Sequence, residues 1–477
     1  MQDSQDQAKI PLSGAYVQQF QQSSNNIYEK DIHSNIQSSQ VTQQYSQQSS
    51  MKHLLKYEFE FSLFNPRKSQ INSDKKKDQA MTFIKFSPFQ IPLKTKFKIG
   101  QNDNQKDEQH VDLLAIGFYN EVKIFTLQNN KISQIPQVLL FKEIILDQKF
   151  SDQIENLLCC DWAMWTQNSI KSQILAFAGI LGLIYVFDLS KQIKQEMYEL
   201  QGHGAAIKDL KFNPIHSHIL ISASDDKTLR VWNAYLQQQL LVIGQAIQPT
   251  FTYFSIDWHS NGRELVASCS DFTLRLFEFN DQFFDQNLQK KSQMHYGNQN
   301  VETQIHNLQV ELCLPYQADM QFDKLLSFKT YQFQIGNGKE LYSQVRFIND
   351  LVITRSVNGQ IKVVKLFKQP MTSKETQFCD VLELRSIDTQ DKSYNIDRVQ
   401  FDIGFDVKII KNGSEELLEI TTGDQDGNIA SYSLNSGEKA FQSNISRNQS
   451  NQQFSYSKFG KYLAVSQQNG IVDVFQE

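Results

Sequence analysis

From residue 57 onward the chain is a succession of short runs in which apolar and polar side chains alternate, separated by turn-forming residues. Alternation with a period of two, in runs rich in β-branched and aromatic residues, is typical of strands with one buried face. One unit recurs, a turn followed by an alternating pentad that usually ends in an aromatic residue, and it predicts an all-β fold. Its seven copies begin at Glu121, Leu183, Thr228, Thr273, Gln360, Asn428 and Ile471.

The spacing of the pentads identifies the architecture. Successive copies start 62, 45, 45, 87, 68 and 43 residues apart. The shortest separations match the roughly 40–45 residues of one four-stranded propeller blade, and the longer ones imply loop insertions. The chain is therefore predicted to form a seven-bladed β-propeller over residues 51–477. A propeller needs its last blade completed by a strand from the other end of the chain, because this removes the exposed sheet edges. The alternating run at residues 57–64 is the candidate for that strand, opposite residues 471–475.

The clearest repeat runs from Gly202 to Trp232 and resembles a WD repeat. In such repeats a histidine, a strand serine or threonine, a turn aspartate and a strand tryptophan are hydrogen-bonded in series and lock the blade. The residues assigned to this lock are His203, Ser222 (with Ser224 as the alternative), Asp226 and Trp232. A histidine, serine and aspartate could also form a nucleophilic triad, but the repeat context favours the structural role.

Two segments differ from the rest. About half of residues 1–50 are Gln, Ser or Asn, with too few apolar residues to offset the entropy of folding, so a disordered N-terminal tail is predicted. Residues 280–323 are predicted to separate the fourth and fifth blades. Phe284, Leu288 and Lys291 lie there at helical spacing, which predicts a partly helical insertion on the rim. This insertion is either a simple loop elaboration or a docking surface.

Composition narrows the possible functions. The five cysteines include no Cys-x-x-Cys pair, which argues against a disulfide framework or a zinc knuckle, and a reducing compartment is the default. No apolar stretch approaches the roughly 20 residues that span a bilayer. The net charge of −5 offers no general attraction to nucleic acid, and no membrane or sequence-specific nucleic-acid partner is expected. Without a phosphate-binding glycine loop or a metal-ligand motif, no enzyme activity, cofactor or metal is predicted.

The stretch Gly202–Pro214 resembles the corresponding blade of the embryonic ectoderm development / extra sex combs family. That family is the WD-repeat subunit of Polycomb repressive complex 2. Residues 155–162, 342–356 and 395–401 are similar to further segments of the family, in the same order. The resemblance implies a nuclear, non-catalytic scaffold that supports histone H3 lysine methylation and transcriptional repression. Its partners would be the catalytic methyltransferase subunit on one face and the histone H3 tail on the other.

The family holds a trimethyl-lysine in an aromatic cage at the mouth of the central channel. A quaternary ammonium is attracted to ring faces and cannot donate hydrogen bonds, so such a cage needs several aromatic residues. The positions of this sequence that match the channel site are Phe86, Leu158, Tyr342, Asp397 and Arg398. Since three of them are not aromatic, a weakened or altered methyl-lysine site is expected, with Trp165 and Tyr394 as possible substitutes. The alternative function is that of a general WD-repeat adaptor in ubiquitin ligation, trafficking or RNA processing.

Overall fold

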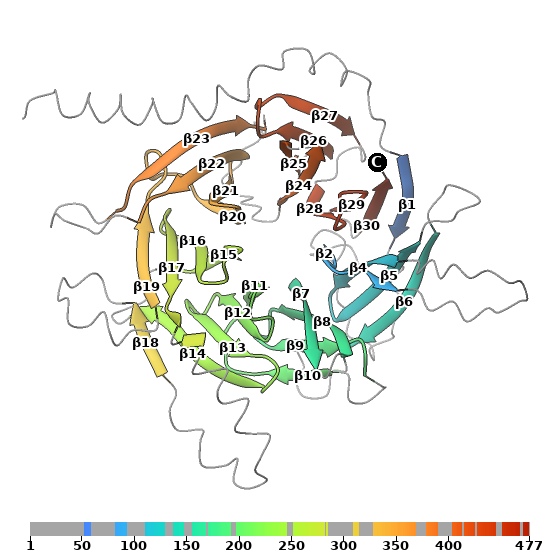
Figure 1. Ribbon diagram of the computed structural model, residues 1–477, viewed down its shortest axis with the longest axis horizontal. Helices are drawn as coiled ribbons and strands as arrows, with labels where there is room; N and C mark the ends of the chain where they lie inside the picture. The colour runs from blue at the N-terminus through green and yellow to red at the C-terminus, as the bar shows by residue number, and fades with distance from the viewer. Residues whose placement is uncertain are drawn as a thin grey trace, which may run out of the picture. The chain divides into compact units, whose positions relative to one another are not determined.

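The computed structural model describes residues 52–58, 82–92, 110–128, 137–146, 155–167, 170–191, 197–245, 251–281, 283–284, 309–313, 328–368, 378–389, 403–412, 415–424, 427–444, 451–467 and 471–476. These stretches form seven separate sheets around a central space (Figure 1). Within each sheet the strands that follow one another in the chain pair in antiparallel fashion. The predicted seven-bladed β-propeller is confirmed.

Blade one consists of β2 (Thr82–Phe86), β4 (His110–Phe118), β5 (Glu121–Gln128) and β6 (Gln137–Ile145), with the short β3 (Ile91–Pro92) beside β4. Blade two consists of β7 (Leu157–Gln167), β8 (Ile170–Gly179), β9 (Ile184–Asp188) and β10 (Met197–Leu200). Blade three consists of β11 (Ile207–Phe212), β12 (Ile219–Ser224), β13 (Leu229–Asn233) and β14 (Gln238–Gln245), with β18 (Gln309–Cys313) outside β14. Blade four consists of β15 (Tyr253–Trp258), β16 (Glu264–Cys269), β17 (Leu274–Phe279) and β19 (Phe328–Phe333).

Blade five consists of β20 (Tyr342–Ile348), β21 (Leu351–Ser356), β22 (Gln360–Leu366) and β23 (Val381–Asp388). Blade six consists of β24 (Phe405–Asn412), β25 (Glu415–Gly423), β26 (Asn428–Ser433) and β27 (Lys439–Asn444). Blade seven consists of β28 (Asn451–Tyr456), β29 (Tyr462–Gln467), β30 (Ile471–Gln476) and β1 (Lys52–Glu58). Every predicted pentad falls on the third strand of its blade, counted from the centre, because this strand is flanked on both sides and its alternation is strongest.

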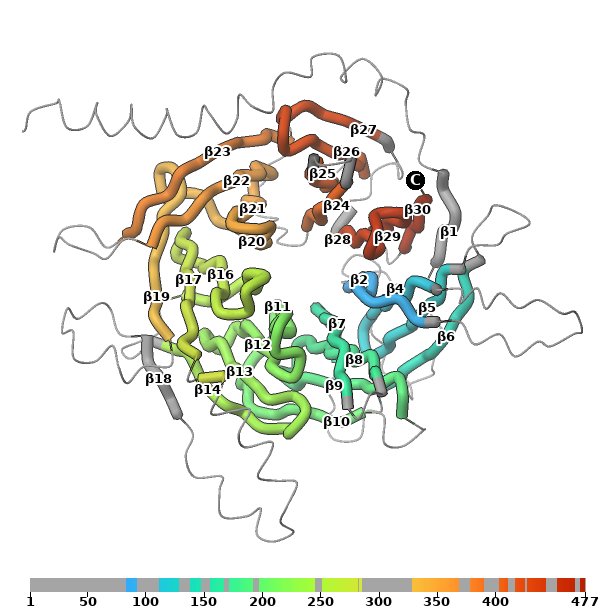
Figure 2. Tube along the Cα trace, in the orientation of Figure 1, coloured from blue at the N-terminus to red at the C-terminus, as the bar shows by residue number. Residues whose placement is uncertain are grey.

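Blade seven closes the ring by joining the two ends of the propeller. The outer strand β1 pairs antiparallel with β30, and Glu58 lies opposite Ile471. Figure 2 shows the next junction of the ring, where β29 of blade seven lies beside β2 of blade one. A closing strand from the N-terminal side was predicted, but its position differs. The strand is Lys52–Glu58, and residues 59–64 of the predicted run lie outside the described residues. The strand begins five residues before the predicted run, in the segment Lys-His-Leu-Leu-Lys, which alternates less regularly, and Tyr57 and Glu58 of the predicted run are its last two residues.

The insertion after residue 280 lies inside blade four and not between blades four and five. The third strand β17 pairs with β19, which follows the insertion in the chain. Within the insertion, β18 runs parallel to β14 of blade three and widens that sheet to five strands. Helical backbone occurs at Asp281, Phe283 and Phe284, and the rest of the predicted helix lies outside the described residues.

The hydrophobic core is divided among the spaces between neighbouring blades. One buried cluster combines Val231 of blade three with Trp258 and Phe277 of blade four, and the others bridge neighbouring blades in the same way. Side chains on the two faces of each strand therefore pack against different neighbours. This explains why the strands are buried on both faces while still alternating in sequence.

Candidate functional site

The central channel contains a cavity with a volume of about 520 Å³. Residues of the innermost strands of blades one to five and seven line it, and the residues leading into β24 complete the ring. This volume lies within the roughly 300–1,000 Å³ of ordinary small-molecule sites. Because each blade contributes only a few side chains, the chemistry of the channel depends on how the inner strands are aligned.

Five inner strands carry the same irregularity near their first residue. In β7, β11, β15 and β20 the residue skipped by the pairing is Leu158, Lys208, Phe254 and Ser343, respectively, and β28 shows the same shift. A β-bulge of this kind re-aims one side chain out of the regular alternation. All four named residues line the channel. We call this level, with Ile403, the channel mouth.

Three residues further along, the inner strands present alternating charges. From blade one to blade seven this level, which we call the channel belt, consists of Lys85, Asp161, Lys211, Asp257, Arg346, Asp406 and Ser455. Hydrogen bonds between blades fix the common level. Asp161 Oδ2 accepts the backbone N–H of Phe212 at 2.7 Å, and Asp257 Oδ2 accepts that of Phe347 at 2.9 Å. The carboxylates of the belt therefore join each even-numbered blade to the next.

The same arrangement continues around the ring. Asp406 Oδ2 accepts the N–H of Tyr456 at 2.7 Å, and Ser455 Oγ accepts that of Phe86 at 2.8 Å. Charged acceptors form stronger hydrogen bonds than neutral ones, and buried carboxylates are tolerated only when cations neutralise them. The lysines and arginine of the odd-numbered blades provide this neutralisation.

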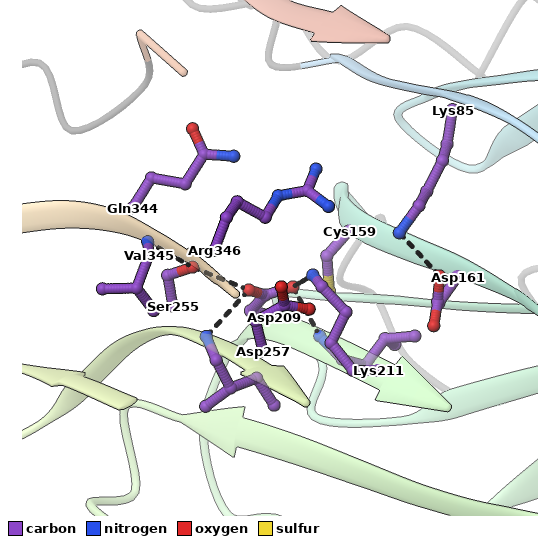
Figure 3. A network of polar contacts seen from close by, with 12 residues as sticks. Lys85, Cys159, Asp161, Asp209, Lys211, Ser255, Asp257, Gln344, Val345 and Arg346 are labelled. Carbon is purple, nitrogen blue, oxygen red and sulfur yellow. Dashed lines mark hydrogen bonds and ion pairs between the residues drawn. The ribbon is translucent and has the colours of Figure 1, made fainter. Parts of the chain in front are cut away.

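Two lysines of the belt form close ion pairs. Lys85 Nζ lies 2.6 Å from Asp161 Oδ1, and Lys211 Nζ lies 2.6 Å from Asp209 Oδ1 (Figure 3). Burial acts to lower the pKa of Lys85, but the attraction of Asp161 outweighs it and raises the pKa above its ordinary value. Burial acts to raise the pKa of Asp209, and Lys211 outweighs it in the opposite direction. Lys85 and Asp209 therefore stay ionised near neutral pH.

Asp257 and Arg346 are in a different situation. Burial raises the pKa of Asp257, and the nearby Arg346 offsets only part of this rise. Burial acts to lower the pKa of Arg346, but the attraction of Asp406 and Asp257 outweighs it. The ion pair between Arg346 Nη2 and Asp406 Oδ1 spans 3.8 Å, which is too long for a hydrogen bond.

The structure does not bring the sequence-predicted channel residues together. Leu158 lines the channel, whereas Phe86 is buried in the core between blades seven and one and Tyr342 in the core between blades four and five. Phe86 follows the belt residue Lys85, and its N–H donates to the belt residue Ser455. It therefore lies one residue past the belt, four residues past the level of Leu158, which is a step of about 13 Å along a strand. Phe86 and Tyr342 are therefore core residues, because their positions in the alternation face the neighbouring blades.

The remaining predicted residues do not complete a cage among the described residues. Asp397, Arg398 and Tyr394 lie outside them, and the inner strand of blade six is β24, which begins beyond that segment. Trp165 is buried, and its indole N–H donates to the carbonyl of Ser217 at 2.9 Å. Sequence reasoning missed Phe254 at the mouth, and the register shift that exposes it leaves no trace in the hydrophobic pattern.

The four lock residues of blade three form one continuous hydrogen-bond series. His203 Nδ1 lies 2.7 Å from Asp226 Oδ2, and His203 Nε2 lies 2.7 Å from Ser222 Oγ. Trp232 Nε1 donates to the same serine oxygen at 2.9 Å. The alternative serine, Ser224, instead donates to the carbonyl of Ala205. The series ties the segment before β11 to the turn after β12.

Burial argues against a catalytic role for this series. Ser222 is fully buried and its oxygen already contacts both His203 and Trp232, so no substrate can reach it. Burial lowers the pKa of His203, although the hydrogen bond to Asp226 acts in the opposite direction. Burial also acts to raise the pKa of Asp226, but hydrogen bonds from His203, Thr228 and the Gly204 N–H hold it well below its usual range. The lock is a structural device.

Other chemistry is sparse in the part of the chain that the structure describes. No group of three or more potential metal ligands occurs there. Cys159, Cys160, Cys269 and Cys379 are buried and form no disulfide bond, and burial raises the pKa of Cys269 to about 12. Within the same residues, no helix has the length and apolar character needed to cross a membrane. The channel mouth, the belt and the outer faces remain as candidate binding surfaces.

Comparison with known proteins gives the fold a biological context. The WD domain, G-beta repeat, matches residues 194–233 and 250–278. Polycomb protein esc of Drosophila virilis is 31% identical over 138 residues, which are 29% of this chain and 32% of that protein. Polycomb protein EED of Chaetomium thermophilum is 27% identical over 161 residues, 33% of this chain and 27% of that protein. The aligned part thus spans about a third of these relatives.

Solved structures agree over a much larger part of the chain. A chain of the crystal structure of the Chaetomium thermophilum polycomb repressive complex 2 superposes with a TM-score of 0.62 and 13% identity, covering 90% of this chain and 98% of that one. A chain of the same complex with H3K27me3 and H3K27M gives a TM-score of 0.60 at 13% identity and covers 89% of this chain and 97% of that one. The resemblance to the embryonic ectoderm development / extra sex combs family is confirmed.

Proposed function

We propose that this chain is the WD-repeat scaffold subunit of a Polycomb-type histone H3 lysine methyltransferase complex. The observation that carries the proposal is the agreement of two independent comparisons. The curated relatives include Polycomb proteins esc and EED, and the propeller superposes on chains of polycomb repressive complex 2 over nine-tenths of its length. The chain would reside in the nucleus and act without catalysis of its own.

The architecture suits a scaffold. Hydrogen bonds between inner strands link blade to blade, and a paired strand closes the ring, so the two faces keep a fixed geometry. Preorganised surfaces bind with a smaller ordering cost than flexible ones. One face would hold the catalytic subunit and the other the histone H3 tail, as the resemblance implies. The N-terminal tail predicted for residues 1–50 lies outside the described residues.

Pull-down of the full-length, tagged protein from nuclear extract tests the proposal. The expected result is co-purification of a lysine methyltransferase and methylation of added histone H3 by the captured material, with the tag alone as control. Capture of a ubiquitin ligase, a vesicle coat or an RNA-processing assembly, without histone H3 methylation, would overturn the proposal in favour of a general adaptor.

The histone-binding role would be exercised with little preference for a trimethylated lysine. Of the four bulge residues at the channel mouth, only Phe254 is aromatic, and Leu158 occupies a position at which the related family has tyrosine. A single ring supplies one cation–π contact of about 0.5–2 kcal/mol. Asp397 and Arg398 remain candidates for the same site, where Arg398 would repel a cation.

Peptide titration measures this preference directly. We expect the wild-type protein to bind trimethylated and unmodified histone H3 peptides within about tenfold of each other, because one such contact amounts to little more than 1.4 kcal/mol. The variant Leu158→Tyr adds a second ring and should shift the preference toward the trimethylated peptide. Strong wild-type preference for the trimethylated peptide would contradict a weakened site.

A further inference from the structure

Arg346 occupies an unusual position in the channel belt. Its side chain extends from β20 toward the side of the channel on which Lys85 and Asp161 lie (Figure 3). A guanidinium group has five N–H donors. Among the described residues its recorded polar contact is the 3.8 Å ion pair with Asp406. The remaining donors face the channel, because Arg346 is one of the residues that line the cavity.

The charges that line the cavity are mainly positive. Four cationic side chains line it, Lys85, Lys208, Lys211 and Arg346, against two carboxylates, Asp209 and Asp225. Lys211 is paired with Asp209 at 2.6 Å and Lys208 with Asp225 at 3.0 Å. The other two cations, Lys85 and Arg346, pair with Asp161 at 2.6 Å and Asp406 at 3.8 Å, and neither of these carboxylates is among the residues that line the cavity.

The three belt carboxylates are engaged with the neighbouring blades and are not among the residues that line the cavity. One oxygen each of Asp161, Asp257 and Asp406 is held against a backbone N–H of the next blade. Their negative charge keeps Lys85 and Arg346 ionised, and these two cations do line the cavity. A ligand between Lys85 and Arg346 therefore meets these two cations before it meets the belt carboxylates.

We propose that the channel binds a small oxyanion, a phosphate or a carboxylate, between Arg346 and Lys85. The planar fork of arginine matches the two oxygens of such a group, and a lysine opposite adds a third charge-assisted hydrogen bond. Both cations line the same cavity, and the positive charge of Arg346 acts to lower the pKa of Lys85, because like charges repel. An anion between them converts this repulsion into attraction. A cavity of about 520 Å³ accommodates a small free molecule.

This site is independent of the proposed scaffold function and of the histone peptide. It lies at the belt, three residues past the bulge residues of the mouth on each inner strand. A complex that fails to methylate histone H3 would leave the anion site untouched, and loss of anion binding would leave the identity of the protein partners untouched. The two proposals therefore fail separately.

Isothermal titration of the full-length protein tests the site. The probes are inorganic pyrophosphate and malonate, at ionic strength held constant with sodium chloride, so that both oxyanion chemistries are compared. Saturable binding of either probe supports the site, and the tighter one identifies phosphate or carboxylate as the natural chemistry. Absence of saturable binding for both would overturn the proposal.

Variants separate the fork of Arg346 from general attraction. Arg346→Gln should weaken binding by about tenfold or more, and Arg346→Lys, which keeps the charge without the fork, should give an intermediate loss. Arg263→Gln is the matched control, because Arg263 forms an exposed ion pair with Asp281 far from the channel. Lys208→Gln tests general attraction from the mouth. An equal loss in Lys208→Gln and Arg346→Gln would overturn the assignment to the belt.

Thermal unfolding of each variant is measured first, to confirm that the propeller is intact. If Arg346→Gln does not fold, Lys85→Gln replaces it, with the same expected loss of about tenfold. A folded Arg346→Gln or Lys85→Gln variant with wild-type affinity would contradict the proposal.

Discussion

Blades three and four contain almost the same turn and differ in how they use it. The turn and strand read Asp226-Lys-Thr-Leu-Arg230 in blade three and Asp271-Phe-Thr-Leu-Arg275 in blade four. In blade four, Arg275 donates to both oxygens of Asp271, at 2.6 and 3.1 Å. In blade three, Arg230 stays 3.7 Å from Asp226, because His203 occupies that carboxylate at 2.7 Å.

The segment preceding the inner strand decides between the two arrangements. Before β11 it places His203 against the aspartate, whereas before β15 it places the ring of Phe251 under the guanidinium of Arg275, 3.6 Å from its centre. An imidazole competes with the arginine for the carboxylate, and a phenyl ring cannot. The same local sequence therefore gives a hydrogen-bonded lock in one blade and an ionic lock with a cation–π contact in the next. The two arrangements differ in the partner of the aspartate, because His203 can be neutral whereas Arg275 keeps its positive charge.

The largest difference should appear when the turn aspartate is removed from blade four. Asp271→Ala leaves the guanidinium of Arg275, whose side chain is 9% exposed, without its carboxylate. Removing one partner of a buried ion pair costs about 3–5 kcal/mol. Urea unfolding measures this loss, and Asp281→Ala, whose ion pair with Arg263 is exposed, should change the unfolding free energy by less than about 1 kcal/mol. A smaller loss for Asp271→Ala than for its counterpart in blade three would break the comparison.

Removal of the aspartate from blade three should cost less. Asp226→Ala leaves His203 without its acceptor, but the imidazole can remain neutral, and the expected loss is about 1–3 kcal/mol. Asp225→Ala, which removes only the half-exposed partner of Lys208, is the control in the neighbouring position. Melting temperatures of Asp226→Ala and wild type that coincide would show that the series does not support the blade.

The smallest expected effect is a dependence of the unfolding free energy on pH, which should arise from His203 in blade three and not from the contact between Asp271 and Arg275 in blade four. The pKa of His203 in the folded state lies below its ordinary value of 6.5, since burial disfavours the charged form. The unfolded chain therefore binds more protons below pH 6.5, and the lock of blade three weakens as the pH falls from 7.5 to 5.5, by less than about 1.4 kcal/mol for each unit of pKa difference.

The contact of Asp271 with Arg275 in blade four involves no histidine, and Arg275 holds the pKa of Asp271 below its ordinary value against the effect of burial. The unfolding free energy is measured at both pH values for wild type and His203→Phe. The variant copies the phenyl ring of blade four and should lose this part of the pH dependence. Identical slopes for the two proteins would show that His203 does not carry it.

The sequence predicted those parts of the molecule that depend on local pattern. The pentads fall on third strands because period-two alternation is a property of a single strand, and the lock follows from the spacing of His203, Ser222, Asp226 and Trp232 within one repeat. The predicted position of the closing strand differs from the observed one, because β1 pairs with β30 from the opposite end of the chain and a local pattern does not determine such a pairing.

The residues that line the channel were harder to predict, because the pairing register of each inner strand decides which of its side chains face the cavity. A one-residue bulge brings Phe254 and Lys208 into the cavity, and a continuous alternation would have turned both away. Phe86 and Tyr342 illustrate the opposite error, since similarity of sequence located their strands but not the direction of their side chains. The alternating charges of the belt become visible only when seven inner strands are placed side by side.

The closing strand has a consequence for biosynthesis. Residues of β1 are synthesised about 420 residues before those of β30, with which they pair. At translation rates of ~5–20 residues per second, this delay is on the order of 20–80 s. Throughout this time β1 has no partner strand to complete blade seven, and a chain that stops before residue 471 never supplies one. Closure thus serves as a check on completeness, which distinguishes a finished polypeptide from a truncated one by an unpaired strand that chaperones and proteases can recognise.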